Sequence, residues 1–274
     1  MVDHDVFSEM HRKALFDEIA SFEQRFSRFL PGSEVNQFRE ANPGTCGISE
    51  KFAVLLTQAE KLRCLTENMY DPAVGGLLEH AGYDRAYRLT PDQEVSAFHL
   101  PVWSLEGVNL TIDGPVVFDL GGIGKGYCID MAGSILERLG YQYFLVEGGG
   151  DMYGTTKRDG SPYRIALEWP GRPDIAFGTV ALRYQGVAVS DSFKRRWQNW
   201  HHIIDPHEKK PITAIIGATA LAQSAFAADS MTSGLFLSST DQYETLSQEL
   251  EAEFVVFKED GMAQKSPGWP GELF

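Results

Sequence analysis

The chain has few cysteines, no long apolar run and a shortage of basic residues. Cys46, Cys64 and Cys128 are widely spaced, and no Cys-x-x-Cys pair occurs. This spacing argues against a disulfide framework or a zinc site and predicts buried thiols in a reducing compartment. No stretch approaches the roughly 18 apolar residues of a transmembrane helix, and the N-terminal segment lacks the apolar run of a signal peptide. We therefore expect a cytoplasmic protein with no membrane insertion.

Basic residues are outnumbered by acidic ones. The chain has 24 Lys and Arg against 38 Asp and Glu, which gives a net charge of −14 and a sequence pI of about 4.9. Long-range repulsion opposes binding to nucleic acid or to an anionic membrane, so we expect no nucleic-acid partner. A polyphosphate ligand would need a local cation. The length of 274 residues and 43% hydrophobic content predict a globular chain with one domain or two fused subdomains.

Helix-like segments surround a series of strand-like runs. Apolar spacing predicts helices over 7–29, over 52–62 with Ser49 as the N-cap, over 129–139 with Gly140 as the stop, and over much of 225–250. Short apolar or β-branched runs predict strands at 116–120, 143–151, 164–169, 179–184, 186–190, 201–205 and 254–257. Because consecutive strands are flanked by helices, we expect an α+β fold with antiparallel sheets.

The glycine-rich loop GGIGKG (121–126) lies between a predicted strand and a predicted helix. Such a loop aims backbone N–H groups at a phosphate. It is not a Walker loop, because no Ser or Thr follows Lys125 and Asp119 occupies the first glycine position. It is closer to a dinucleotide-binding fingerprint, although Tyr127 stands at the third glycine. A phosphate site and an ordinary tight turn both remain open.

The string HHIIDP (201–206) brings histidines and an acid together. On an extended strand, His202 and Ile204 would lie on one face and Asp205 on the other. A histidine and an aspartate at a strand end can orient or activate a nucleophile. The alternative is that Asp-Pro simply opens a turn.

The string AADSMTSGLFL (227–237) places hydroxyls beside a carboxylate. On a helix Asp229 and Ser233 are one turn apart, and Thr232 lies beside Ser233. These hard oxygen ligands suit Mg²⁺, which uses few protein ligands and keeps its waters and substrate phosphates. The alternative is an ordinary acid near a helix N-terminus with satisfied hydroxyls.

In MYDPAVGGLL (69–78) an aromatic residue and an acid precede a proline turn, which can stack on a planar ligand or plug the core. Together with the glycine loop, the oxygen set and the histidine, this loop indicates binding and cleavage of an aromatic nucleotide diphosphate. Mg²⁺ and Lys125 would neutralise its phosphates against the acidic surface.

Several longer strings occur in one order between about residues 27 and 237. They are SRFLPGSEV, MYDPAVGGLL, FDLGGIGKGYCID, VEGGGD, DGSPYRIALEWP, VAVSDS, HHIIDP and AADSMTSGLFL. In these strings the chain resembles the ApbE-type FAD:protein FMN transferases. The resemblance implies a single domain over 1–274 with tandem T-fold-like antiparallel sheets and flanking helices. Compared with the family pattern, we expect the first strand to be missing.

The resemblance also implies an activity. With Mg²⁺, FMN would pass from FAD to a Thr or Ser hydroxyl of an acceptor flavoprotein, releasing AMP. Alternatives are an FAD pyrophosphatase that forms FMN and AMP, and a non-catalytic flavin-binding relative.

Individual roles follow from the same resemblance. His202, or a neighbouring carboxylate such as Asp205, would handle the proton of the acceptor hydroxyl. The expected FAD contacts are Phe29, Met69, Tyr70, Asp71, Asp119, Lys125 and Ile203. The expected magnesium ligands are Asp229, Thr232, Ser233 and the backbone carbonyl of Gly122.

Overall fold

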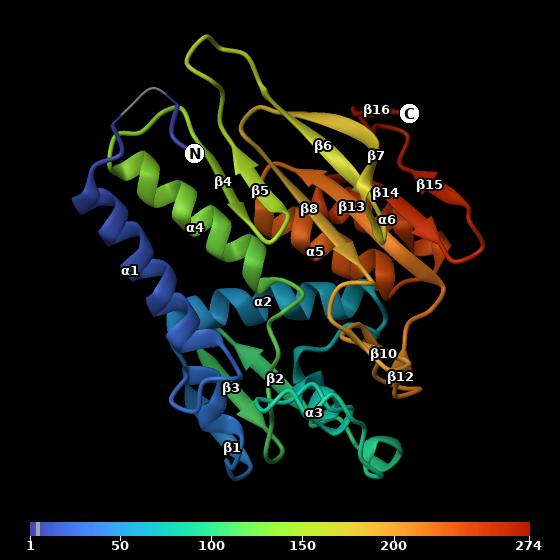
Figure 1. Cartoon of the computed structure of the whole chain (residues 1–274). Coiled ribbons are helices and arrows are strands. Elements are labelled where there is room, and N and C mark those ends of the chain that lie inside the picture. The colour runs from blue at the N-terminus through green and yellow to red at the C-terminus, as the bar shows by residue number, and fades with distance from the viewer. Residues whose placement is uncertain (4–5) are drawn as a thin grey trace. The chain divides into compact units, whose positions relative to one another are not determined.

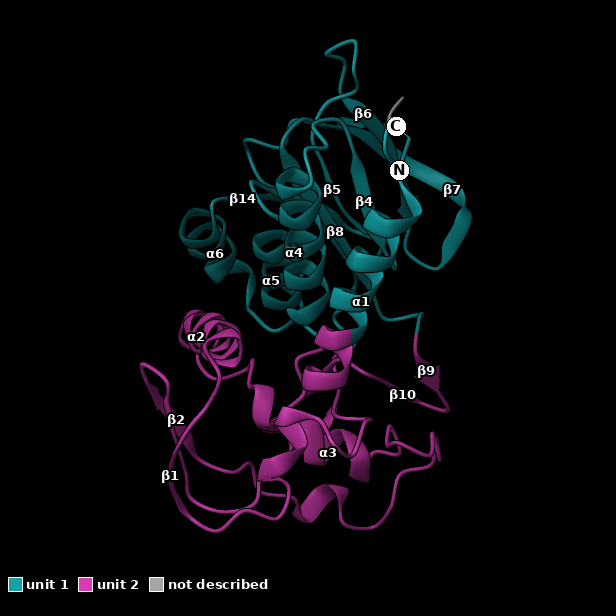
Figure 2. Ribbon diagram, turned by 90° about the vertical axis from the view of Figure 1, so that its left-hand side faces the viewer, with its two compact units in different colours: residues 1–20, 122–194, 213–274 teal, residues 21–121, 195–212 magenta. Residues whose placement is uncertain are grey.

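The computed structural model describes residues 1–3 and 6–274, and the chain divides into two compact units (Figure 2). Unit 1 comprises residues 1–20, 122–194 and 213–274. Unit 2 comprises residues 21–121 and 195–212. The predicted first helix is confirmed as α1 (Glu9–Phe26), which contributes residues to both units.

Unit 1 is built on a six-stranded antiparallel sheet with the order β15-β14-β13-β8-β5-β4 (Figure 1). Its strands are β4 (Leu145–Gly148), β5 (Asp151–Gly154), β8 (Gln185–Asp191), β13 (Ile215–Ala222), β14 (Ala252–Lys258) and β15 (Ala263–Lys265). The central strand β13 escaped prediction because alanine and glycine fill half of it, and both have low strand propensity.

A smaller antiparallel sheet, β16-β7-β6, packs on one face of the six-stranded sheet. It consists of β6 (Tyr163–Trp169), β7 (Arg172–Leu182) and β16 (Glu272–Leu273). The core between the sheets includes Leu182 of β7, Val187 of β8 and Leu221 of β13. The predicted strands at 164–169, 179–184, 186–190 and 254–257 are therefore confirmed.

Two helices of unit 1, α4 (Gly124–Arg138) and α5 (Ala225–Phe236), lie on the other face of the large sheet (Figure 1). Burial of Ile135 and Leu136 fixes the inner face of α4. The chain then turns at Gly140, whose φ of 90° suits glycine. The last turn-and-helix pair, η4 (Thr240–Gln242) and α6 (Tyr243–Leu250), completes the predicted C-terminal helical stretch.

Unit 2 combines helices with small antiparallel sheets. Its helix α2 (Glu50–Leu65) begins as predicted, because the Ser49 side chain accepts a hydrogen bond of 3.2 Å from Phe52 N. The other elements are η1 (Glu34–Phe38), η2 (Pro72–Val74), α3 (Gly75–His80), η3 (Val95–Ala97), the sheet β1-β3-β2 (Gly44–Gly47, Asn109–Ile112, Trp103–Glu106), and the hairpins β9–β10 (Arg196–Trp197, Trp200–His201) and β11–β12 (Ile204–Asp205, Lys210–Pro211).

In unit 2 the strand prediction for 116–120 is wrong, and that for 201–205 is confirmed only at its two ends. The run 116–120 alternates buried and half-buried side chains as a strand would, but it joins no sheet. Its amides bond instead to single carbonyls of short 3₁₀-helices, Val116 N to Phe38 O of η1 at 2.9 Å and Asp119 N to Pro72 O of η2 at 2.7 Å. The run 201–205 is broken by a bend at His202, so His201 and Ile204 are the buried residues and the predicted alternation fails.

The cysteine prediction is also wrong in part. The thiols are free, but Cys46 and Cys64 are exposed and Cys128 is half-buried. Cys46 lies on β1, a short strand whose four residues all face solvent. No helix of the described part of the chain combines the length and the apolar character that crossing a membrane requires.

Candidate functional site

Lys125, in the first turn of α4, lies between two buried carboxylates of unit 1. Its ammonium contacts Asp151, the first residue of β5, and lies 3.3 Å from Asp229 Oδ1 on α5. Asp151 is fully buried and Asp229 almost so. The second Asp151 oxygen accepts a hydrogen bond of 3.0 Å from Val189 N. Loop, strand and helix thus place one cation against two anions.

The close contact of these charged groups shifts the pKa values of Lys125 and Asp229. Burial opposes a charge on Lys125, but the Asp229 and Asp151 carboxylates outweigh that effect and raise the pKa of Lys125. Burial raises the pKa of Asp229 to about 6, against the opposing charge of Lys125. The lysine is therefore the charged partner that permits two carboxylates to be buried together.

Helices α4 and α5 cap each other. Gly126 N in the first turn of α4 donates to Asp229 Oδ2 at 2.9 Å, and the amides of Ala225 and Phe226 at the start of α5 donate to the two Asp130 oxygens, each at 2.9 Å. A Cβ on Gly126 would lie 2.3 Å from Ala225 O, so this approach requires glycine. The glycine loop therefore serves helix packing, and its Gly126 amide is taken by a protein carboxylate.

The predicted magnesium residues lie together in unit 1. Ser233 Oγ donates to Gly122 O at 2.7 Å, and Thr232 Oγ1 donates to Asp229 O at 2.9 Å and lies 3.0 Å from Ser190 Oγ. Carboxylate, hydroxyl and carbonyl oxygens are the ligands that Mg²⁺ prefers, so the donor set fits this ion. Among the described residues no cluster of three or more His, Cys, Asp or Glu side chains is arranged to hold a metal. A bound Mg²⁺ would thus need oxygens beyond carboxylates.

Phe29, a predicted FAD contact, belongs to an aromatic cluster of unit 2. Its half-buried ring stacks on Tyr87 with centroids 5.6 Å apart and meets Tyr83 edge-on at 5.4 Å. Tyr83 in turn stacks on Trp197 at 5.5 Å. Tyr87 is 55% exposed, so the cluster reaches the surface of the unit. Such a cluster offers a planar ligand an aromatic face.

The predicted Met69–Asp71 loop is held by internal bonds. Tyr70 is buried, which agrees with the core-packing alternative, and Met69 is half-buried. Asp71 Oδ1 accepts hydrogen bonds from Ala73 N at 2.8 Å and from the Trp103 indole at 2.9 Å. Burial raises the pKa of Asp71 despite these bonds. Its carboxylate therefore shapes the proline turn.

Asp119 is engaged by a residue that the sequence patterns did not single out. Arg28 Nε donates to Asp119 Oδ2 at 2.5 Å, and both groups are largely shielded from solvent. Burial alone would raise the pKa of Asp119, but the Arg28 charge and hydrogen bond outweigh it and lower that pKa. The predicted nucleotide contact is thus half of a buried ion pair.

The histidine string runs from the end of the hairpin β9–β10 through a bend at His202 into the first strand and the turn of the hairpin β11–β12. His202 is half-buried at the bend, and Ile203 N donates to His201 Nδ1 at 3.2 Å. Asp205 Oδ1 accepts hydrogen bonds from His207 N at 2.8 Å and Glu208 N at 2.9 Å. Asp205 therefore stabilises a turn, which is the alternative role that the Asp-Pro pair allows.

A pocket of about 200 Å³ in unit 1 is lined by the β6–β7 turn, by parts of β8 and β13 and by the residues that follow β8, including Trp169, Val189 and Phe193. Ser190 also lines this pocket, and its Oγ lies 3.0 Å from Thr232 Oγ1. The pocket therefore borders a residue that contacts a predicted magnesium ligand.

The predicted residues therefore form separate groups. Unit 1 brings together Gly122, Lys125, Asp229, Thr232 and Ser233, and unit 2 holds Phe29, Met69, Tyr70, Asp71, Asp119, His202, Ile203 and Asp205. Sequence patterns assigned no role to Asp151 or Arg28, although both lie within the strings that carry the family resemblance. The available signals were the position of Asp151 directly after three glycines and the position of Arg28 beside Phe29, a predicted FAD contact.

Unit 1 thus combines antiparallel sheets and helices with a lysine, two buried carboxylates and two hydroxyls, a set suited to binding a metal ion and charged groups. A family model described as the ApbE family matches residues 2–256. The chain belongs to the ApbE family.

Named relatives agree with this assignment. A FAD:protein FMN transferase of Vibrio cholerae serotype O1 is 28% identical over 230 residues, which cover 78% of this chain and 69% of the relative. A protein of the same name from Rhodobacter capsulatus is 26% identical over 247 residues, which cover 83% of this chain but only 45% of the relative.

Solved structures share the fold. An ApbE protein from Thermotoga maritima matches with a TM-score of 0.83 at 22% identity, covering 96% of this chain and 91% of that one. The flavin transferase ApbE from Vibrio cholerae also matches at 0.83 and 22% identity, covering 97% and 90%. The predicted α+β fold is therefore confirmed.

Proposed function

We propose that this chain transfers FMN from FAD to a Thr or Ser hydroxyl of an acceptor flavoprotein, releasing AMP, with Mg²⁺ bound. The observation that carries this proposal is the convergence of Lys125, Asp151, Asp229 and the Ser233–Gly122 oxygens in unit 1. The family membership and the names of the relatives support the choice of substrate.

The transfer exchanges a phosphoanhydride bond for a phosphoester bond. The acceptor oxygen bonds to the FMN phosphorus, and the bond from that phosphorus to the oxygen bridging to AMP breaks. The bridging oxygen leaves with AMP and keeps the bonding electrons. The hydroxyl proton passes to His202, while Asp205 maintains the adjoining turn.

The residues of unit 1 would bind the charged part of FAD. Asp229, Thr232, Ser233 and the Gly122 carbonyl would hold Mg²⁺, which supplies charge neutralisation at the phosphates when bound. Lys125 adds a second positive charge beside them. These local cations offset the net charge of −14, which otherwise repels an anionic dinucleotide.

The residues of unit 2 would bind the aromatic part. Phe29 belongs to a ring cluster of the kind that stacks on planar groups, and Met69, Tyr70, Asp71 and Ile203 are assigned to the same task from the family resemblance. A reducing cytoplasm remains the proposed location, since the three cysteines are free thiols.

Mass spectrometry tests the proposal. The protein is incubated with FAD, Mg²⁺ and a flavoprotein domain carrying a Thr or Ser attachment site, with EDTA-treated samples as the control. The expected result is an acceptor whose mass rises by one FMN only when Mg²⁺ is present, with AMP formed in equal amount. Release of free FMN and AMP without labelling assigns an FAD pyrophosphatase instead. Retained FAD with no turnover assigns a flavin-binding protein.

A further inference from the structure

Arg28, in the turn that follows α1, has a buried guanidinium with several partners inside unit 2. Only 4% of the residue is exposed. Besides Asp119, Arg28 donates to Tyr83 O at 2.8 Å. Its Cζ lies 4.2 Å from the centroid of the Phe29 ring and 5.0 Å from that of the Tyr83 ring. One cation thus stacks on two members of the aromatic cluster and binds a carboxylate.

Both oxygens of the Asp119 carboxylate accept hydrogen bonds. Oδ2 accepts from Arg28, and Oδ1 accepts from Gly121 N at 2.7 Å. A Cβ on Gly121 would lie 2.7 Å from the same Oδ1, so glycine permits this closed turn. The chain continues directly into Gly122, the residue with the predicted metal-binding carbonyl. Asp119 therefore links Arg28 to the peptide that precedes Gly122.

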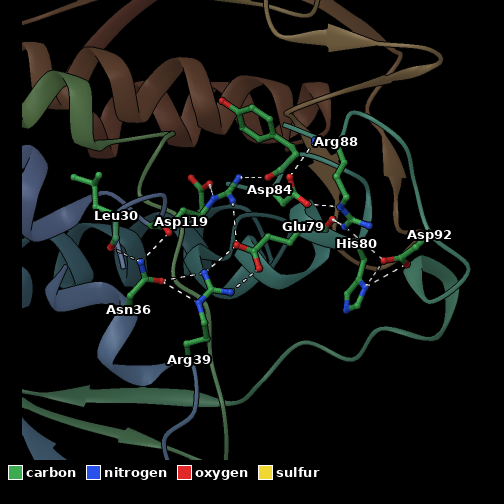
Figure 3. A network of polar contacts seen from close by, with 11 residues as sticks. Leu30, Asn36, Arg39, Glu79, His80, Asp84, Arg88, Asp92 and Asp119 are labelled. Carbon is green, nitrogen blue, oxygen red and sulfur yellow. Dashed lines mark hydrogen bonds and ion pairs between the residues drawn. The ribbon is translucent and has the colours of Figure 1, made fainter. Parts of the chain in front are cut away.

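A second arginine completes the network without touching the aromatic ring or Asp119 (Figure 3). Arg39 donates to Glu79 at 2.6 and 2.9 Å and to the Asn36 side chain, while Glu79 lies 3.5 Å from Arg28. Asn36 Nδ2 donates to the carbonyls of Arg28 and Leu30. Two cations balance two carboxylates, so the buried charges are paired.

We propose that Arg28 is a positioning residue for FAD, one that holds the Phe29 ring and, through Asp119, the Gly121 turn. The inference rests on the proposed function and adds to the predicted role of Asp119, whose carboxylate also holds Arg28. A carboxylate facing phosphates would repel them, whereas one neutralised by a buried guanidinium does not. The planar guanidinium is required, because it stacks on rings while donating sideways to Asp119 and Tyr83.

The test compares Arg28→Lys with Arg39→Lys as the matched control. Both changes keep the charge and remove the guanidinium fork within the same network. FAD affinity is measured by equilibrium titration with Mg²⁺ present, together with the melting temperature, the KM for FAD and kcat. We expect Arg28→Lys to weaken FAD binding about tenfold and to raise KM with kcat nearly unchanged, while Arg39→Lys binds FAD as the wild type does.

Asp119→Asn provides a second variant that tests the same contact from the carboxylate side, and wild-type FAD affinity in this variant overturns the inference by itself when Arg28→Lys does not fold. It should weaken FAD binding about as much as Arg28→Lys, and the double variant should be no weaker than either single one. Wild-type affinity in Arg28→Lys and Asp119→Asn, or equal losses in Arg28→Lys and Arg39→Lys, would overturn the inference. A wild-type protein that binds no FAD would instead overturn the proposed function, and the inference with it.

Discussion

The Asp229 carboxylate accepts a 2.9 Å hydrogen bond from the Gly126 amide, so a side chain of α5 closes the first turn of α4. Asp130 of α4 does the same for α5 at the Ala225 and Phe226 amides. Each carboxylate offsets the partial positive charge at a neighbouring helix N-terminus. The predicted metal ligand Asp229 therefore also aligns the two helices that carry the candidate site.

This reciprocity allows the metal role of Asp229 to be separated from its structural role. Asp229→Asn and Asp130→Asn each remove one capping charge, and each should lower the free energy of unfolding by about 1 kcal/mol. Only Asp229→Asn should abolish Mg²⁺-dependent FAD turnover, since Asp130 lies outside the oxygen set. Chemical unfolding and FAD turnover against Mg²⁺ concentration measure the two effects. Equal activities in the two variants would contradict the metal assignment and favour a nucleotide site of another kind.

Lys125 should matter for stability as well as for phosphate binding. Lys125→Met leaves Asp151 and Asp229 buried without their cation, so we expect the free energy of unfolding at pH 7 to fall by about 3 kcal/mol in metal-free buffer. The double variant with Asp151→Asn should recover most of this loss. Urea unfolding gives both values. A single variant as stable as the wild type would show that the lysine does not compensate these carboxylates.

Gly126 should tolerate no side chain. Gly126→Ala places a Cβ 2.3 Å from Ala225 O and should cost about 3 kcal/mol of unfolding free energy, because two helix backbones would have to separate. Gly133→Ala on the same helix is the control, since its Cβ would meet a Tyr153 ring carbon at 3.3 Å and the ring can shift. Thermal melts compare the two variants. A larger loss at Gly133 would show that the α4–α5 approach is not the tight one.

The burial of His201 predicts that its contribution to the free energy of unfolding falls in mild acid. Burial, together with the Arg196 charge, lowers the pKa of His201, and its ring is neutral because Nδ1 accepts from Ile203 N while Nε2 donates to Ile212 O. Below about pH 6.5 the unfolded chain therefore binds a proton that the folded chain does not. The contribution of His201 to the free energy of unfolding should fall with pH from there until the lower folded pKa is passed, whereas Asp229, whose pKa is raised to about 6, contributes in the opposite direction over part of this range. His201→Gln should flatten this part of the profile in urea titrations, and an unchanged slope would contradict the assignment.

Local patterns in the sequence were sufficient where a local interaction decides the structure. Ser49 predicted the start of α2 because an N-cap bonds only to the turn that follows it. Asp229 and Ser233 were predicted on one helix because their spacing matches its turn. The strand prediction for 116–120 failed for the opposite reason, since its alternation is that of a strand while its amides bond to single carbonyls of distant 3₁₀-helices.

The partners of buried charges depended on distant segments of the chain. Asp151 lies 26 residues from Lys125, and Asp119 lies 91 residues from Arg28. The spacing of residues in the sequence does not predict such pairs, because the cation that neutralises a given carboxylate is the one that the tertiary structure brings into contact with it. By itself the sequence determined the family, the α+β class and the residue types of the candidate site. Only the tertiary structure decided that Lys125 is shared between two carboxylates and that Asp119 is held by Arg28, since burying a charge requires a counter-charge in contact with it.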